Sequence, residues 1–184
     1  LINGMPLIHV ELKKSGVPVS EAQYQIQKYL HEGVFTGIFS LVQIFVAMNP
    51  EECVYFANPG RADKFSEKFC FHWADQYNNP INDWSTIAER LLSIPMAHEL
   101  IGYYTVADQT DNTLKVMRSY QYYAASKISR RVSEMKWDDQ NIYGGYVWHT
   151  TGSGKTMTSF KSAQLIANSG DADKVVFLMD RIEL

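Results

Sequence analysis

The chain has 184 residues, of which 46% are hydrophobic and 20% charged, and its formal net charge is -3. These fractions are ordinary for water-soluble proteins, and the length allows one compact domain and part of a second. No apolar run approaches the roughly 20 residues that cross a bilayer, so we expect no membrane insertion. The slight negative charge does not indicate a polyanion partner, so any nucleic-acid contact must come from local basic groups.

The first residues, LINGMPLIHVELKK, contain no start methionine, basic leader or small-residue cleavage site. They are interpreted as the beginning of a fragment rather than as a secretory signal. The two cysteines, Cys53 and Cys70, have no neighbour at metal-ligand spacing. We expect both to be buried thiols in strands, which suits a reducing cytoplasm.

Residues 1–78 are predicted to form a mixed α/β domain. Residues 6–14 are rich in branched side chains and predict a strand that is well buried. Ser20 and Gln23 have the spacing of a capping box for a helix through about Leu30. Three further strands are expected in SLVQIFVAMN, CVYFAN and KFCFHWA, because Asn-Pro and Pro-Gly turn signals separate them.

Residues 79–136 are predicted to form a helical connection. Asn82 or Asp83 can cap its first helix, and later helices are expected from about Pro95 and from about Ser119. The apolar stripe of the first helix would contain Trp84, Ile87, Leu91 and Leu92.

Residues 137–184 are predicted to begin a parallel sheet. The order is a strand in GYVW, a glycine-rich loop, a helix and a second strand in VVFLMD, which together make a βαβ unit.

The glycine-rich loop has the residue types of a phosphate-binding loop. Its small residues let backbone N–H groups turn toward a phosphate, and the following helix N-terminus adds positive partial charge. The general pattern has glycine where this chain has His149, a departure typical of helicase-like motors rather than of small GTPases. A glycine turn without a ligand is the alternative. The predicted loop consists of Thr151, Gly152, Ser153, Gly154, Lys155 and Thr156.

Lys155 and Thr156 carry the chemistry of this loop, because an ammonium can reach terminal phosphates and a hydroxyl can bind Mg²⁺. About thirty residues earlier lie Tyr120 and Gln121. A glutamine amide can pair with both the N6 donor and the N7 acceptor of adenine, while an aromatic ring packs on the base. Helix capping and packing is the alternative for this pair.

Glu11 and Lys13 are two apart on a predicted strand, so their side chains share one face. A carboxylate can hold a divalent metal ion there, and an ammonium can stabilise charge that develops during phosphodiester hydrolysis. An exposed ion pair is the alternative. Gln25 and Tyr29 form a polar pair one helical turn apart in the next helix, which favours a site.

Taken together, NGMPLIHVELKK, QIQKY, RSYQYYAA, GGYVWHTTGSGKT and VVFLMDRIEL resemble, in this order and spacing, the restriction (R, motor) subunit of type I restriction-modification enzymes. The resemblance extends over essentially the whole chain. It implies an α/β architecture in which a PD-(D/E)xK nuclease-like mixed-sheet domain precedes the start of a RecA-like, superfamily 2 helicase parallel-sheet domain.

The resemblance also implies residue roles. Glu11 becomes a metal ligand and Lys13 the catalytic lysine, while Gln25 and Tyr29 support the nuclease site through DNA positioning. The implied motor residues are Gln121 as adenine reader, Gly152, Gly154, Lys155 and Thr156 as holders of ATP and Mg²⁺, and Asp180 and Arg181 as a segment that touches the DNA track.

The implied activity is ATP-driven translocation of double-stranded DNA coupled to metal-dependent double-strand cleavage, with methyltransferase and specificity subunits as partners. The family's first nuclease aspartate is expected before Leu1, and its acidic ATPase motif and arginine finger after Leu184, so the chain is expected to be an internal slice. Two alternatives are a standalone superfamily 2 helicase with an inactive nuclease-like domain, and a nucleotide-binding module without turnover.

Overall fold

The computed structural model of the chain describes residues 3–135 and 144–178. The chain separates into two units, Leu1–Ser119 and Tyr120–Leu184. The division lies at the beginning of a long helix, inside the predicted helical connection, so the functional domain boundaries stay predictions. Among the described residues, no helix is long and apolar enough to span a membrane.

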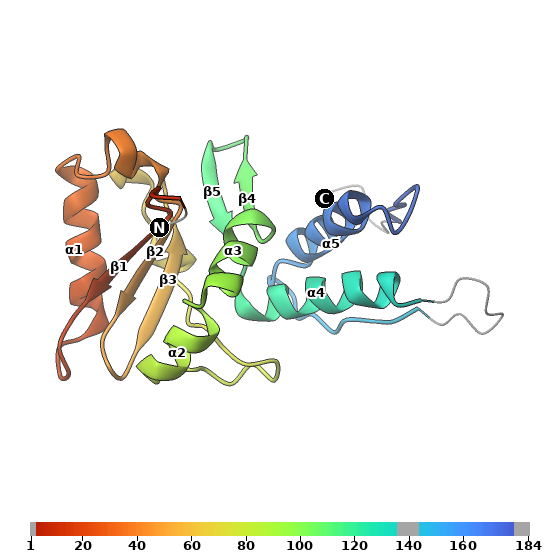
Figure 1. The fold of residues 1–184 in the computed structure, drawn as a ribbon, viewed down its shortest axis with the longest axis horizontal. Coiled ribbons are helices and arrows are strands. Elements are labelled where there is room, and N and C mark those ends of the chain that lie inside the picture. The colour runs from red at the N-terminus through yellow and green to blue at the C-terminus, as the bar shows by residue number, and fades with distance from the viewer. Residues whose placement is uncertain (1–2, 136–143, 179–184) are drawn as a thin grey trace. The chain divides into compact units, whose positions relative to one another are not determined.

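The first unit contains a three-stranded mixed sheet. Its elements are β1 (Ile8–Leu12), α1 (Val19–His31), β2 (Ile44–Met48) and β3 (Cys53–Ala57). The strand order is β1-β2-β3, with β1 parallel to β2 and β2 antiparallel to β3. Parallel neighbours need a crossover, and α1 supplies it beside the sheet (Figure 1).

Helix α1 covers one face of this sheet. Apolar residues at helical spacing on α1 meet the alternate residues of β2 and β3 that point toward the helix. The resulting buried cluster contains Val19, Ala22, Ile26, Val42, Phe45, Ala47, Val54 and Phe56. At β2 and β3 the other face is buried as well, since Tyr55 and Trp73 are fully inaccessible and the Tyr55 hydroxyl donates to the Met117 carbonyl oxygen at 2.9 Å. Burial on both faces explains why every residue of β2 is buried.

The predicted capping box is wrong. Helix α1 begins at Val19 after Pro18, which is its N-cap and makes no side-chain hydrogen bond. The ring of Pro18 restricts its own φ, observed at -55°, and the helix has its N-cap two residues before the predicted one, Ser20. Ser20 therefore already lies within the first turn.

The predicted strand KFCFHWA is also wrong. Lys68 and Phe69 belong to a short 3-10 helix, Glu67–Phe69. Only two isolated antiparallel bridges follow within the described residues, from Phe71 to Tyr55 and from Ala74 to Pro80. Beyond the bridge to Tyr55 the backbone bonds to a later segment instead of β3, because Ile81 N–H donates to the Trp73 carbonyl oxygen at 2.9 Å.

The cysteine prediction holds for one residue of the two. Cys53 is buried in β3, and burial raises the pKa of its thiol to about 12. Cys70 lies outside any strand and is half-buried, and burial raises its pKa to about 11. Both thiols are therefore protonated at neutral pH.

The rest of the first unit contains two short helices and a hairpin. The helices are α2 (Trp84–Arg90) and α3 (Ile94–Gly102), and the hairpin strands are β4 (Thr105–Asp108) and β5 (Thr113–Val116). The Asp83 carboxylate caps α2 by accepting from the Thr86 N–H at 2.9 Å, which confirms one of the two predicted caps. In the predicted stripe, Ile87 and Leu91 are buried but Trp84 is exposed.

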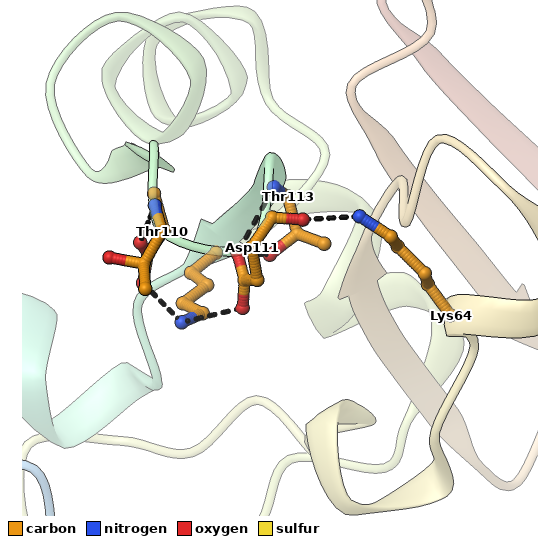
Figure 2. A network of polar contacts seen from close by, with 6 residues as sticks. Lys64, Thr110, Asp111 and Thr113 are labelled. Atoms are coloured by element: carbon orange, nitrogen blue, oxygen red, sulfur yellow. Dashed lines mark hydrogen bonds and ion pairs between the residues drawn. The ribbon is translucent and has the colours of Figure 1, made fainter.

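The β4–β5 hairpin was not predicted, and polar contacts hold its turn (Figure 2). The Lys115 ammonium lies 2.5 Å from the Asp108 carboxylate and 3.2 Å from that of Asp111. The hydrogen bond from Lys115 is the main reason that the pKa of Asp108 falls to about 2. Lys64, from a 3-10 helix spanning Ala62–Lys64, donates to the Asp111 carbonyl oxygen and so ties the hairpin to the sheet side of this unit.

The second unit contains α4 (Ser119–Ser133) and α5 (Lys155–Ser169) in the predicted places. The two strands of the predicted βαβ unit are not observed within the described residues. Residues 144–150 and 174–178 have no regular secondary structure. A strand requires hydrogen bonds to a neighbour, and within the described ranges no strand pairs with either segment. Their apolar side chains stay exposed, with Trp148 88% and Leu178 98% accessible.

Replacing Phe45 with alanine is expected to destabilise the first unit by about 3–5 kcal/mol, since it leaves a cavity in a packed core. The Phe45 ring is fully buried, with centroids 4.8 Å from Phe35 and 5.5 Å from Phe56. Denaturant unfolding followed by tryptophan fluorescence measures the loss. Ile38→Ala, at a side chain 56% exposed, is the control and should change stability by less than about 0.5 kcal/mol. Equal midpoints for both variants would contradict the assigned core.

Candidate functional site

Glu11 lies in β1, and Lys13 is the residue that directly follows this strand. Both side chains are on the face of the sheet that α1 covers. The Glu11–Ala47 register places Glu11 on the same sheet face as the α1 core cluster. Lys13 Nζ donates to Glu11 Oε1 at 3.1 Å. The Lys13 side chain is only 24% exposed and the Glu11 side chain 16%, so the pair does not project into bulk water.

Strand β1 is less buried than predicted, and the apolar residues beside Glu11 are among its exposed ones. Val10 and Leu12, which point away from α1, are 37% and 65% exposed. Strand β1 is at the edge of the sheet as described, and its apolar face has less cover than its polar face. The half-buried position of Glu11 therefore comes from α1 and its surroundings, not from its apolar neighbours in sequence.

Sequence reasoning missed His9, which lies two residues before Glu11 on the same face. His9 Nε2 is 3.6 Å from Glu11 Oε2. Burial lowers the pKa of His9, and the Glu11 carboxylate opposes this shift only in part. The period of two that joined Glu11 to Lys13 applies equally to His9, so the signal was present in the sequence.

Gln25 and Tyr29 lie one turn apart on α1, and both are half-buried. The Tyr29 ring meets the His9 ring edge-on with centroids 6.2 Å apart, so Tyr29 reaches Glu11 through His9. Among the residues that the structure describes, no hydrogen bond joins Gln25 to Glu11 or Lys13. The structure thus pairs Glu11 with Lys13, and Tyr29, on α1, contacts His9 beside this pair.

The described part of the chain offers no group of three His, Cys, Asp or Glu side chains that could hold a metal ion. Glu11 is a single carboxylate with one ammonium beside it. Since Mg²⁺ is commonly bound through one or two carboxylates together with substrate phosphates, Glu11 fits as one ligand of such a site but not as a complete one.

The glycine loop leads directly into α5, whose N-cap is Gly154. Gly152 and Gly154 have φ values of 77° and 79°, in the left-handed region that favours glycine. A Cβ at Gly152 would meet open space, whereas a Cβ at Gly154 would come within 2.4 Å of Gln121 Nε2. Two left-handed glycines before a helix N-terminus fit a phosphate-binding loop.

Several donors of the loop converge on the Thr150 carbonyl oxygen. It accepts from Ser153 N–H at 3.3 Å, Ser153 Oγ at 2.7 Å and Lys155 Nζ at 3.3 Å. Lys155, Thr151 and Thr156 are exposed. A phosphate could therefore replace a neutral carbonyl as the partner of the Lys155 ammonium, a stronger, charge-assisted contact.

Tyr120 and Gln121, at the beginning of α4, contact the same loop. The Tyr120 hydroxyl donates to the Ser153 carbonyl oxygen at 2.8 Å. Gln121 Nε2 donates to the carbonyl oxygens of Ser153 and Gly154 at 3.2 and 3.3 Å. The structure therefore places Tyr120 and Gln121 beside the loop, in contact with its backbone, and their pairing with adenine stays a prediction.

His149, the departure from the general loop pattern, has a defined place. Its Nδ1 is 2.9 Å from Ser153 Oγ, and its ring centroid is 6.0 Å from that of Tyr120. Asp180 and Arg181, predicted to touch DNA, lie outside the described residues.

Two known families match separate parts of the chain. Residues 1–64, with the Glu11–Lys13 pair, match the family described as type I restriction enzyme R protein N terminus. Residues 120–184, with the glycine loop, match the SWI2/SNF2 ATPase family. The chain therefore combines a restriction-subunit segment with an ATPase segment.

Individual endonuclease subunits are similar to the chain as well. The chain is 39% identical over 184 residues to the type I restriction enzyme SauCOLORF180P endonuclease subunit of Staphylococcus aureus (strain COL), and the alignment covers 100% of this chain and 19% of that protein. It is 36% identical to the SsaAORF53P endonuclease subunit of Staphylococcus saprophyticus, with the same coverage. It is 33% identical over 150 residues to the EcoprrI endonuclease subunit of Escherichia coli, covering 80% of this chain and 48% of that protein.

The chain belongs to the R-subunit family of type I restriction enzymes. It spans about a fifth of the length of the staphylococcal relatives.

Proposed function

We propose that the chain is part of the restriction subunit of a type I restriction-modification enzyme. In the whole subunit, ATP-dependent translocation of double-stranded DNA is coupled to metal-dependent double-strand cleavage. The proposal depends on one observation: each candidate site lies in the segment whose family suits it. The half-buried Glu11–Lys13 pair lies in the restriction-subunit segment, and the glycine loop with its left-handed backbone lies in the ATPase segment. Methyltransferase and specificity subunits are the proposed partners.

The first unit carries the proposed nuclease site, of the PD-(D/E)xK kind. Glu11 would be one ligand of a divalent metal ion such as Mg²⁺, which would supply Lewis acidity and an activated water. The Lys13 ammonium, held 3.1 Å from Glu11, would bring positive charge to the scissile phosphate. Gln25 and Tyr29 would position the DNA from α1.

The second unit carries the proposed ATP site, as the start of a RecA-like, superfamily 2 motor domain. The loop Thr151–Thr156 would hold the phosphates through backbone N–H groups and the N-terminus of α5. Lys155 would pair with the terminal phosphates and Thr156 would contribute its hydroxyl to Mg²⁺. The Gln121 amide would give up one of its hydrogen bonds to the loop backbone and pair with the edge of adenine instead.

Replacing Lys155 with alanine tests the nucleotide site. Loss of an ammonium opposite a phosphate leaves that charge unpaired, so the affinity of the full-length subunit for a fluorescent ADP analogue with Mg²⁺ should fall by about 30-fold or more. Lys127→Ala, at an exposed lysine of α4, is the matched control and should bind as the unmodified protein does. If Lys155→Ala binds as tightly as the control, the loop is not the nucleotide site.

A further inference from the structure

We propose that His149 is a positioning residue of the glycine loop, which fixes Ser153 and thereby prepares the loop for phosphate. This inference rests on the proposed nucleotide site and assigns a role to the residue that replaces the usual glycine. Its basis is the pair of contacts at Ser153 Oγ, which lies 2.9 Å from His149 Nδ1 and 2.7 Å from the Thr150 carbonyl oxygen.

The hydrogen at each of these contacts can be assigned. A serine hydroxyl has one hydrogen, and a carbonyl oxygen can only accept, so the Ser153 hydrogen goes to Thr150. The His149 Nδ1 must then be the donor, with the hydroxyl oxygen accepting. His149 Nε2 is shielded from water and has no hydrogen-bond partner within the described residues. Nδ1–H is therefore the functional donor, and a glycine at this position would have none.

Ser153 is held from its main chain as well. Its carbonyl oxygen accepts from the Tyr120 hydroxyl at 2.8 Å and from Gln121 Nε2 at 3.2 Å. The Tyr120 ring also meets the His149 ring edge-on. Ser153 is thus fixed through its side chain by His149 and through its backbone by α4.

Fixing Ser153 matters because its two neighbours are flexible. Gly152 and Gly154 both have left-handed backbones, and glycine loses more conformational freedom on ordering than any other residue. A loop that is ordered before the ligand arrives binds it more tightly, because that entropy is not lost on binding. His149 contributes to affinity in this way without touching the phosphate.

The test is a double-mutant cycle in the full-length subunit, with the fluorescent ADP analogue and Mg²⁺ as the probe. His149→Ala should weaken binding by about 5-fold, the effect of one lost hydrogen bond. His149→Asn keeps a side-chain N–H near the position of Nδ1 and should restore binding to within about 2-fold. Ser153→Ala removes the acceptor, so adding His149→Ala to it should have no further effect.

Hydrogen exchange of the nucleotide-free subunit gives a second measurement. His149→Ala should speed exchange of the backbone amides of residues 150–154, and His149→Asn should not. Unchanged nucleotide binding and unchanged exchange in His149→Ala would overturn the inference. It would also be overturned if the double variant lost affinity by the product of the two single losses, because the two residues would then act independently. An unmodified subunit that binds no nucleotide would instead overturn the proposed function. Lys155→Ala separates these cases, because it must lose binding whatever His149 does.

Discussion

Replacing Lys13 with alanine is expected to lower DNA cleavage by about 100-fold to 1,000-fold while ATP hydrolysis continues. The Lys13 ammonium is the positive charge nearest Glu11, at 3.1 Å, and removal of one preorganised group that stabilises transition-state charge commonly costs 100-fold to 1,000-fold, about 2.7–4 kcal/mol. The glycine loop lies in the other unit, so we expect ATP hydrolysis to continue without Lys13. The measurements are plasmid cleavage and phosphate release by the full-length subunit with its partner subunits.

Lys14→Ala is the matched control for this prediction. Lys14 has the same charge and lies next in sequence but is exposed, so its replacement should leave cleavage within about 2-fold, as surface substitutions usually do. Glu11→Gln keeps the shape of the side chain and should reproduce the loss seen for Lys13→Ala. Normal cleavage by both site variants would mean that Glu11 and Lys13 are not the cleavage site. ATP hydrolysis without any cleavage by the unmodified subunit would favour the alternative of a superfamily 2 helicase with an inactive nuclease-like domain.

Much of the first unit was predictable because its signals are local. The α1 helix and strands β1 to β3 were found from branched apolar runs and turn residues close to their observed bounds. KFCFHWA has the same local signals, but its backbone bonds to Ile81 after a single bridge to Tyr55. That competition depends on a segment farther along the chain, which strand propensity does not report.

The β4–β5 hairpin was missed although its turn has a sequence signal. Asp, Thr and Asn residues between Thr105–Asp108 and Thr113–Val116 mark a turn flanked by β-branched residues. The strands have only four residues each, too short for a clear alternation. The ion pairs of Lys115 with Asp108 and Asp111 appear only in three dimensions.

The candidate sites were predictable as residue types but not as contacts. Spacing alone placed Glu11 and Lys13 on one face, and loop chemistry identified Gly152 to Thr156. Neither reveals that Gln121 and Tyr120 bind the loop backbone, because these contacts join α4 to a loop about thirty residues away. Neither reveals that the His149 ring turns back toward the Ser153 hydroxyl, because spacing does not specify a side-chain orientation. The contacts of α4 depend on how the helix packs, which periodicity does not specify.

Replacing Gly154 with valine is expected to reduce nucleotide binding below detection. Gly154 has a φ of 79°, a conformation in which a β-branched residue is a severe outlier. A Cβ there would also lie 2.4 Å from Gln121 Nε2, so Gln121 would have to turn away and lose its bonds to Ser153 and Gly154. The loop would change shape at the residue that begins α5, where the phosphate is expected to bind.

Gly170→Val is the matched control. Gly170 has nearly the same φ, 76°, but it caps the other end of α5, and a Cβ there would meet nothing within 4 Å. The control suffers the same backbone strain, so any loss of binding confined to Gly154→Val comes from the loop and not from a weaker helix. Titration of the ADP analogue into both full-length variants measures the difference. Equal affinities of the two variants for the ADP analogue would mean that the left-handed turn at Gly154 is not needed to hold a phosphate. The N-terminus of α5 would then not be the phosphate-binding site.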